Sequence, residues 1–202
     1  MPVRLLLATH NEHKRRELQR LLAVPGAGAY ELDVLPDAVT LPPEDGETFA
    51  ENALGKARAA ARATGRVSIA DDSGIAAAAL GGAPGVRSAR FAGARAGDAE
   101  NLAKLLREAP AGSALEYVCV IAYVDPDSAV ERLFEGRCTG TLAAVPRGER
   151  GFGYDPAFLP DDSPPAPPGL TMAELSDEQK DAISHRGRAA RAFRAWLDEQ
   201  AA

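Results

Sequence analysis

A short apolar run near the start of the chain leads directly into a helical pattern. The run VRLLLA (3–8) predicts a buried strand, and NEHKRRELQRLL (11–22) predicts an amphipathic helix. The helix turns three leucines inward, namely Leu18, Leu21 and Leu22. The segment YELDVLP (30–36) predicts a second strand, which completes a βαβ-like unit. This arrangement indicates an α/β protein.

The remainder of the chain continues this alternation around a strand-rich middle. Further strands are expected at 66–70, 115–124 and 130–140, and further helices at 49–64, 98–108 and 186–200. Thr48 to Glu51 and Ser176 to Gln179 both have the form of a capping box, which marks a helix start. The last helix is expected to turn inward Ala189, Phe193, Trp196 and Leu197. Helices at both ends with strands between them predict a mixed sheet.

The composition suits one globular domain over residues 1–202, with room for a smaller lobe. The chain is 46% hydrophobic and 26% charged, and its net charge of −6 argues against non-specific nucleic-acid binding. Cys119 and Cys138 have no metal-ligand spacing and are expected to be buried free thiols. The first apolar run is too short for a signal peptide, and no stretch reaches the about 18 apolar residues of a membrane helix. We therefore expect a soluble cytoplasmic protein with no membrane partner.

The segment RVSIADDSGIAAAAL places two acids between apolar runs. Neighbouring side chains on a strand point to opposite sides, so Asp71 and Asp72 cannot share one task if the strand continues. At a strand end, one acid could face a cleft and contribute to a Mg²⁺ site, because Mg²⁺ takes few carboxylates together with phosphates and water. The alternative is a turn stabilised by Asp and Gly.

Two helix starts carry residues suited to phosphate. In ATHNEHK, Asn11 is a plausible N-cap and Lys14 lies one turn into the helix, whose free N–H groups favour anions. Thr48, Asn52 and Lys56 form a polar stripe along the helix at 49–64. The alternatives are an ordinary capped helix in the first case and a solvated face in the second.

The C-terminal third contributes aromatic and cationic side chains. The loop RGERGFGYDP (147–156) carries Phe152 and Tyr154 between glycines, where they could stack on a planar ring. Ser184 is expected to cap the last helix, which puts His185, Arg186 and Arg188 in its first turn. Cations there oppose the helix dipole, so this end faces either an anion or electron-rich base, or simply water.

Five ordered blocks carry a resemblance that covers nearly the whole chain. They are TFAENALGKA, IADDSG, LGGAPGVRSARFAG, RGFGYDPAF and AELSDEQKDAISHRGRA. The chain resembles the inosine/xanthosine triphosphate pyrophosphatase family. This resemblance implies an elongated, two-lobed α/β fold with a central mixed sheet flanked by helices and an active-site cleft between the lobes. It also implies a Mg²⁺-dependent homodimer that hydrolyses XTP, ITP or dITP to the monophosphate and pyrophosphate.

The resemblance also assigns roles to individual residues. The triphosphate would be held by Thr9, His10, Asn11, Glu12, His13, Lys14 and Lys56. Asp72 would bind Mg²⁺ and accept the proton of the attacking water, with Glu44 as the second metal-side carboxylate. The substrate site would be completed by Ser73, Phe152, Gly153, Tyr154, Asp155, Lys180, His185 and Arg186. Asp71 would brace either the strand end or the residues that surround the site, and Ser73 and Gly74 would let the chain turn beside the substrate.

Two features depart from the family pattern, and other functions stay open. His10 stands where the family often has a small residue, and the Pro-rich loop 161–170 is longer than usual. A pyrophosphatase for modified pyrimidine nucleotides and a nucleotide sensor without hydrolysis are the alternatives. A structural or nucleic-acid-binding protein is disfavoured by the acidic charge.

Overall fold

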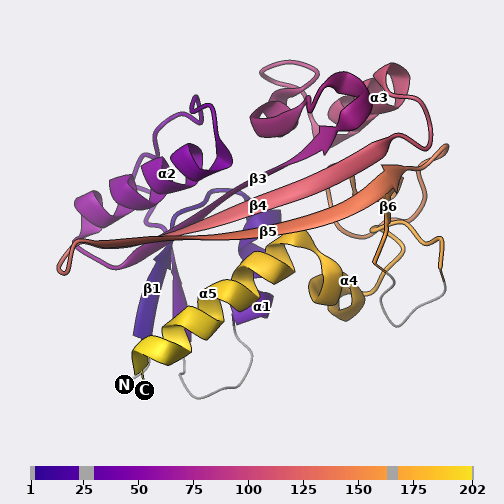
Figure 1. Cartoon of the computed structure of the whole chain (residues 1–202). Coiled ribbons are helices and arrows are strands. Elements are labelled where there is room, and N and C mark those ends of the chain that lie inside the picture. Colours follow the sequence, from indigo (N-terminus) through magenta and orange to yellow (C-terminus); the bar gives the residue numbers. More distant parts are fainter. Residues whose placement is uncertain (1–2, 23–29, 163–167, 202) are drawn as a thin grey trace. The chain divides into compact units, whose positions relative to one another are not determined.

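The structure, a computed structural model, describes residues 3–22, 30–162 and 168–201 and is α/β (Figure 1). Its strands are β1 (Val3–Leu7), β2 (Tyr30–Val34), β3 (Ser68–Ala77), β4 (Ala114–Asp125), β5 (Val130–Leu142) and β6 (Phe158–Pro160). Its α-helices are α1 (Glu12–Leu22), α2 (Phe49–Thr64), α3 (Asp98–Glu108), α4 (Asp177–Ile183) and α5 (His185–Ala201). Short 3-10 helices occupy Ala78–Leu80, Gly85–Arg90 and Asp155–Ala157.

The strands form one mixed sheet in the order β2-β1-β3-β4-β5-β6. β1 pairs in parallel with both β2 and β3, whereas β5 and β6 are antiparallel. The predicted α/β class and mixed sheet are therefore confirmed. β6 was not predicted, because three residues are too few to show an alternating pattern.

The chain divides into two compact units. The first unit contains Met1–Asp72, Cys119–Gly136 and Ala189–Ala202. The second unit contains Ser73–Val118 and Arg137–Arg188. Strands β3, β4 and β5 and helix α5 contribute residues to both units.

In the first unit, alternate strand residues pack against different helices. One core cluster joins α1 and α5 to the odd-numbered residues of three strands, including Leu5, Ile69 and Ile121. The other joins α2 to the even-numbered residues of the same strands, including Leu6 and Ala70. This two-residue period is the signature of a sheet covered on both faces. It also fixes the side to which Asp71 and Asp72 belong, since they follow Ile69 and Ala70 on the same strand.

Helix α5 packs in the first unit as its sequence pattern predicts. Ala189, Phe193 and Leu197 are buried, and Trp196 packs partly buried against the same cluster. The core of the second unit is a separate cluster built from β3, α3, β4, β5 and the segments around β6 and α4. Tyr117, Tyr154 and Phe158 are its large aromatic members.

The helix starts are set by local hydrogen bonds that the sequence predicts. The Thr48 hydroxyl accepts from the Glu51 amide at 3.1 Å, and the Glu51 carboxylate accepts from the Thr48 amide at 3.1 Å. Ser176 and Gln179 form the same reciprocal pair at the start of α4. These boxes satisfy amide donors that have no partner inside the helix, which is why both starts fall at their predicted positions.

The predicted turn at Ser73-Gly74 is wrong, because β3 continues from Ser68 to Ala77. In the sheet, β1 pairs with the start of β3, at Ser68 and Ile69, and β4 is hydrogen-bonded along the other edge of β3. That pairing keeps the strand extended through polar residues that would otherwise favour a turn. In the Pro-rich loop 161–170, residues 163–167 lie outside the described residues. None of the helices described has the length and apolar character needed to cross a membrane.

Candidate active site

The start of α1 places Lys14 beside the two acids of β3. The Thr9 hydroxyl accepts from the Asn11 amide at 3.2 Å, and the Asn11 side chain accepts from the Lys14 amide at 3.1 Å. Asn11 therefore caps the start of α1, as the sequence predicts. The Lys14 ammonium lies 3.3 Å from Asp71 Oδ2 and 3.9 Å from Asp72 Oδ1. One lysine thus contacts both carboxylates.

Helix α2 supplies a second lysine and an amide from its polar stripe. Lys56 is only 5% exposed, and its ammonium donates to the Asp71 carbonyl at 2.6 Å and to the Glu44 carboxylate. It also lies 3.9 Å from Asp72 Oδ1. Asn52, one turn earlier, donates to Asp72 Oδ2 at 3.0 Å. The alternative of a solvated face is therefore wrong for Asn52 and Lys56, which are buried among carboxylates.

The two acids of β3 divide their contacts as strand geometry predicts. Asp71 is 0% exposed and its Oδ2 lies 4.0 Å from the Cys119 thiol, on the side of α1 and α5. Asp72 is 4% exposed and bonds to Asn52 on the side of α2. Their shared contact with Lys14 was not predicted, because the sequence does not show how far the long lysine side chain reaches.

Burial and charge move the pKa values of this cluster in different directions. Burial raises the pKa of Asp72, and the charges of Lys14 and Lys56 with the Asn52 hydrogen bond oppose this without cancelling it. Burial also raises the pKa of Glu44, but the charge and hydrogen bond of Lys56 outweigh it and leave the pKa below its ordinary value. Burial lowers the pKa of Lys56, yet the three carboxylates around it raise the pKa above its ordinary value. Asp72 is therefore tuned toward accepting a proton, while Glu44 and Lys56 stay charged.

The donor chemistry of this cluster fits Mg²⁺ bound together with a phosphate. Glu44 and Asp72 both lie against the Lys56 ammonium, so two carboxylates converge there. Within residues 3–22, 30–162 and 168–201, no three His, Cys, Asp or Glu side chains form a closed metal cage. Mg²⁺ does not need one, because it is commonly held by one or two carboxylates plus substrate phosphates and water.

In the second unit, Asp155 is the centre of a buried network. Its Oδ2 accepts from the Lys180 ammonium at 2.7 Å and from the Phe152 amide at 2.9 Å. Its Oδ1 accepts from the Tyr117 hydroxyl at 3.1 Å. Three segments that are distant in the sequence are thus held by one carboxylate.

The start of α5 adds a histidine and an arginine to this network. Arg186 is 1% exposed and donates to the Ser73 hydroxyl at 2.7 Å. Its guanidinium carbon lies 5.5 Å from the centre of the Phe152 ring, and the Lys180 ammonium lies 5.2 Å from the same ring. The His185 ring stacks on Tyr117, with centroids 4.4 Å apart and planes 5° apart. The alternative that these cations point into water is wrong for His185 and Arg186.

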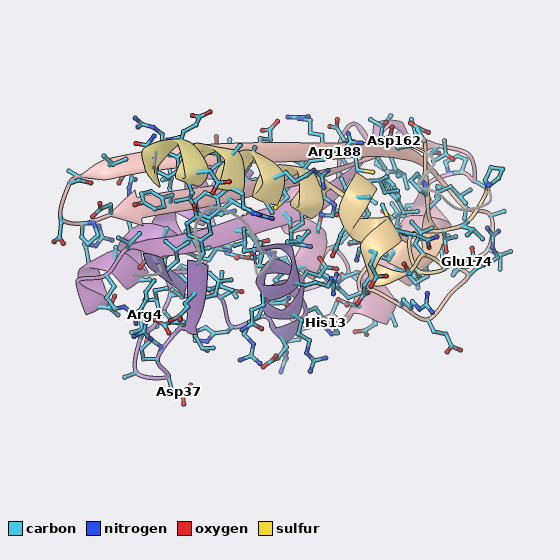
Figure 2. The ribbon with its side chains drawn as sticks, turned by 90° about the horizontal axis from the view of Figure 1, so that it is seen from below. Arg4, His13, Asp37, Asp162, Glu174 and Arg188 are labelled. Carbon is cyan, nitrogen blue, oxygen red and sulfur yellow. The ribbon has the colours of Figure 1, made fainter. Side chains whose placement is uncertain are left out.

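Two neighbouring residues at this helix start have simpler roles. The Ser184 hydroxyl accepts from the Gly187 amide at 3.0 Å, so Ser184 is the predicted cap. Arg188 pairs with Asp162, and Figure 2 shows the two labelled residues side by side. Arg188 is therefore engaged on the exposed surface and takes no part in the Asp155 network described above.

The glycine loop around Phe152 is shaped by close contacts. Gly151 has φ +70°, and a Cβ there would clash with Asp155 Oδ2. The Gly153 amide donates to Asp98 Oδ2 at 2.9 Å. Tyr154 is buried in the core and its hydroxyl donates to the Ser88 carbonyl at 2.7 Å. The Tyr154 ring therefore packs inside the protein, and the predicted stacking of this ring on a ligand has no support in the geometry.

The structure brings most of the predicted site residues into two groups. The acid–lysine cluster, in the first unit, contains Lys14, Glu44, Lys56 and Asp72 together with Asn52 and Asp71. The Asp155 network, in the second unit, contains Ser73, Phe152, Asp155, Lys180, His185 and Arg186 together with Tyr117. His10, Glu12 and His13 are exposed at the start of α1, where Figure 2 labels His13.

Sequence reasoning missed three residues that hold these groups. Asn52 was visible only as part of a polar stripe, and Asp98 only as an acid at a helix start. Tyr117 lies in the apolar run LEYVCVIAYV, where nothing distinguishes it from a core residue.

Comparison with known proteins gives consistent matches. Residues 5–196 match the Ham1 family. The dITP/XTP pyrophosphatase of Frankia alni is 47% identical, with 98% of each chain covered, and that of Deinococcus radiodurans is 49% identical over 92% of this chain and 88% of the relative. Among solved structures, a HAM1 protein from Coxiella burnetii superposes with a TM-score of 0.83 at 37% identity, covering 98% of this chain and 99% of the other.

Proposed function

Because the chain belongs to the Ham1 family, we propose that it hydrolyses the non-canonical purine nucleotides ITP, XTP and dITP to the monophosphate and pyrophosphate. Relatives at 47% and 49% identity are named dITP/XTP pyrophosphatases, which supports this substrate class. The observation that carries the proposal is the acid–lysine cluster. There, two buried or half-buried ammonium groups lie against a carboxylate whose pKa is raised by burial.

In the proposed mechanism, Asp72 accepts the proton of the attacking water. The water oxygen forms a bond to the α-phosphorus, the bond from that phosphorus to the bridging oxygen breaks, and pyrophosphate leaves. A raised pKa makes Asp72 a better proton acceptor, and Asn52 holds its carboxylate in place at 3.0 Å. Lys14 and Lys56 offset the negative charge of the phosphates, so positioning and electrostatics supply most of the rate.

The metal and the triphosphate are proposed to use the residues around this carboxylate. Glu44 and Asp72 would hold Mg²⁺, which when bound supplies charge neutralisation at the phosphate oxygens. The start of α1, next to Thr9 and Asn11, adds the positive end of a helix dipole. Lys56 stays charged in this role because the surrounding carboxylates raise its pKa.

The Asp155 network is proposed to recognise the purine base. Phe152 is half-buried beside two cations and offers a ring for stacking. Lys180, His185 and Arg186 provide donors, which suits the 6-keto oxygen shared by hypoxanthine and xanthine. Adenine carries an amino group at this position and would leave such donors without an acceptor.

Release of pyrophosphate across a panel of nucleotides tests this proposal. Purified protein with Mg²⁺ is incubated with ITP, XTP, dITP, ATP, GTP and modified pyrimidine triphosphates, and pyrophosphate and orthophosphate are measured separately. We expect pyrophosphate from ITP, XTP and dITP far above that from ATP. Orthophosphate in place of pyrophosphate contradicts the reaction, and a preference for pyrimidines contradicts the substrate class. Tight binding of ITP without turnover at any Mg²⁺ concentration identifies a sensor.

We further propose that the protein is a cytoplasmic homodimer. Support for the homodimer comes from the resemblance of its motifs to the pyrophosphatase family. Support for the cytoplasmic location comes from the bacterial relatives named for this enzyme type. Light scattering coupled to size-exclusion chromatography tests the assembly against the chain mass of 21.2 kDa.

A further inference from the structure

Tyr117 connects Asp155 with His185 in the Asp155 network. It lies on β4, its hydroxyl donates to Asp155 and its ring stacks on His185. We propose that Tyr117 is a positioning residue that sets the orientation of His185 for recognition of the base. This inference rests on the proposed function, because it assigns His185 to the purine.

The stacking geometry fixes the plane of the His185 ring. The two planes differ by 5° and the centroids are 4.4 Å apart. The hydrogen-bonding atoms of an imidazole lie in the plane of its ring, so a fixed plane limits the directions in which His185 can bind a ligand. An aromatic stack of this kind contributes interaction free energy beyond that of the apolar area it buries.

The Tyr117 ring is itself held at two points. Its hydroxyl donates to Asp155 Oδ1 at 3.1 Å, and its ring lies 4.6 Å from that of Phe158 at 40°. Asp155 accepts in addition from Lys180 and from the Phe152 amide. Phe152, Lys180 and, through Tyr117, His185 are therefore all oriented from one buried carboxylate.

The competing explanation is that Tyr117 only fills the core. Tyr123 is the matched control, because it lies on the same strand and is 8% exposed where Tyr117 is 6%. The ring of Tyr123 packs against those of Trp196 and Phe193. Tyr123→Leu should thus reproduce the loss of a buried tyrosine without the loss of the stack.

The first measurement is a spectrum of the ligand-free protein. The chain has three histidines, so selective ¹³C labelling of histidine rings gives few resonances, and His185→Gln assigns the one of interest. The ring current of a parallel aromatic ring shifts the protons above it upfield. We expect this upfield shift in the wild type, in Tyr117→Phe and in Tyr123→Leu, and its loss in Tyr117→Leu.

The second measurement is steady-state kinetics with ITP and ATP. Removal of one aromatic stack corresponds to about a two- to tenfold change in binding. In Tyr117→Leu we expect the KM for ITP to rise by about this factor with kcat nearly unchanged, since binding of the base is lost equally in ground and transition states. The preference for ITP over ATP should fall in parallel. Tyr117→Phe keeps the ring and should restore most of the preference.

Several results would overturn the inference. One is a His185 resonance in Tyr117→Leu at its wild-type position. Another is an unchanged ITP:ATP preference in Tyr117→Leu, and a third is the same loss of preference in Tyr123→Leu. If the wild type fails to hydrolyse ITP, the proposed function fails, while the spectrum of the ligand-free protein still reports whether Tyr117 orients His185.

Discussion

Replacing Asp72 by asparagine should affect the turnover of the enzyme and the stability of the folded protein in different ways. Asn is nearly isosteric, and its side-chain oxygen can still accept from Asn52, as Asp72 Oδ2 does at 3.0 Å. The amide cannot take a proton from water. Loss of a general base costs about 10²–10⁴-fold, so we expect kcat to fall by at least that factor with ITP and Mg²⁺.

The free energy of unfolding of Asp72→Asn, unlike its kcat, should not fall. Burial keeps the pKa of Asp72 above its ordinary value in spite of Lys14 and Lys56, so the ionised carboxylate destabilises the folded state at neutral pH. Each unit of such a shift corresponds to about 1.4 kcal/mol. We expect Asp72→Asn to leave the free energy of unfolding unchanged or to raise it by up to about 2 kcal/mol, the upper end of what single stabilising substitutions commonly give.

The difference in free energy of unfolding between Asp72→Asn and the wild type should increase with pH. Because the folded state holds the Asp72 proton more tightly than the unfolded state, the wild type loses stability as pH rises from the unfolded pKa of about 4 to the higher folded value. Asp72→Asn lacks this loss, so its advantage should grow over that interval and then stay constant. Urea unfolding in EDTA, without nucleotide, measures this difference at each pH.

Asp71→Asn is the matched control for both measurements. Asp71 is fully buried on the opposite side of β3 and contacts Lys14 at 3.3 Å. We expect a smaller loss of turnover than in Asp72→Asn, because Asp71 is not the proposed proton acceptor. The reasoning is refuted if Asp72→Asn keeps more than about a tenth of the wild-type kcat. It is also refuted if the variant unfolds at a much lower urea concentration than the wild type at pH 7.

Two further predictions follow from the loop and from the thiols. Gly151→Ala should abolish most ITP turnover, because its Cβ would clash with the carboxylate of Asp155. Gly153→Ala, at φ +62° with open space around it, should cost only backbone strain of about 1 kcal/mol in thermal unfolding. Equal activities of the two variants would contradict this prediction. Cys119 and Cys138 are both fully buried, and burial raises the pKa of Cys138 to about 12, so neither should react with a thiol reagent at pH 8 until denaturant is added. A thiol that reacts in native protein would show that one of these sites opens.

The elements most accurately predicted are those whose boundaries are set by local chemistry. Helix α2 begins where Thr48 and Glu51 exchange hydrogen bonds and ends at Gly65, which adopts φ +64°. Those bonds join residues within four positions, so they are visible in the sequence. β3 is different, because its extension through Ser73 and Gly74 depends on its place in the sheet beside β4. A pattern that favours a turn in isolation is overridden by pairing within the sheet.

The same distinction applies to the candidate site. Motifs single out residues that carry charge or hydroxyl groups, and the structure collects Ser73, Asp155 and Arg186 from three distant segments into one network. The residue that links that network is harder to find. Tyr117 begins a run of buried, mostly apolar residues on β4, so its sequence context is that of a core residue.

Its role depends on a hydrogen bond over 38 positions and a ring contact over a still longer separation. Neither interaction leaves a local pattern. Residues that orient a site from within the core are therefore identified by their contacts, and a buried tyrosine whose hydroxyl meets a carboxylate of the site deserves the same mutational test as the residues that the motifs name.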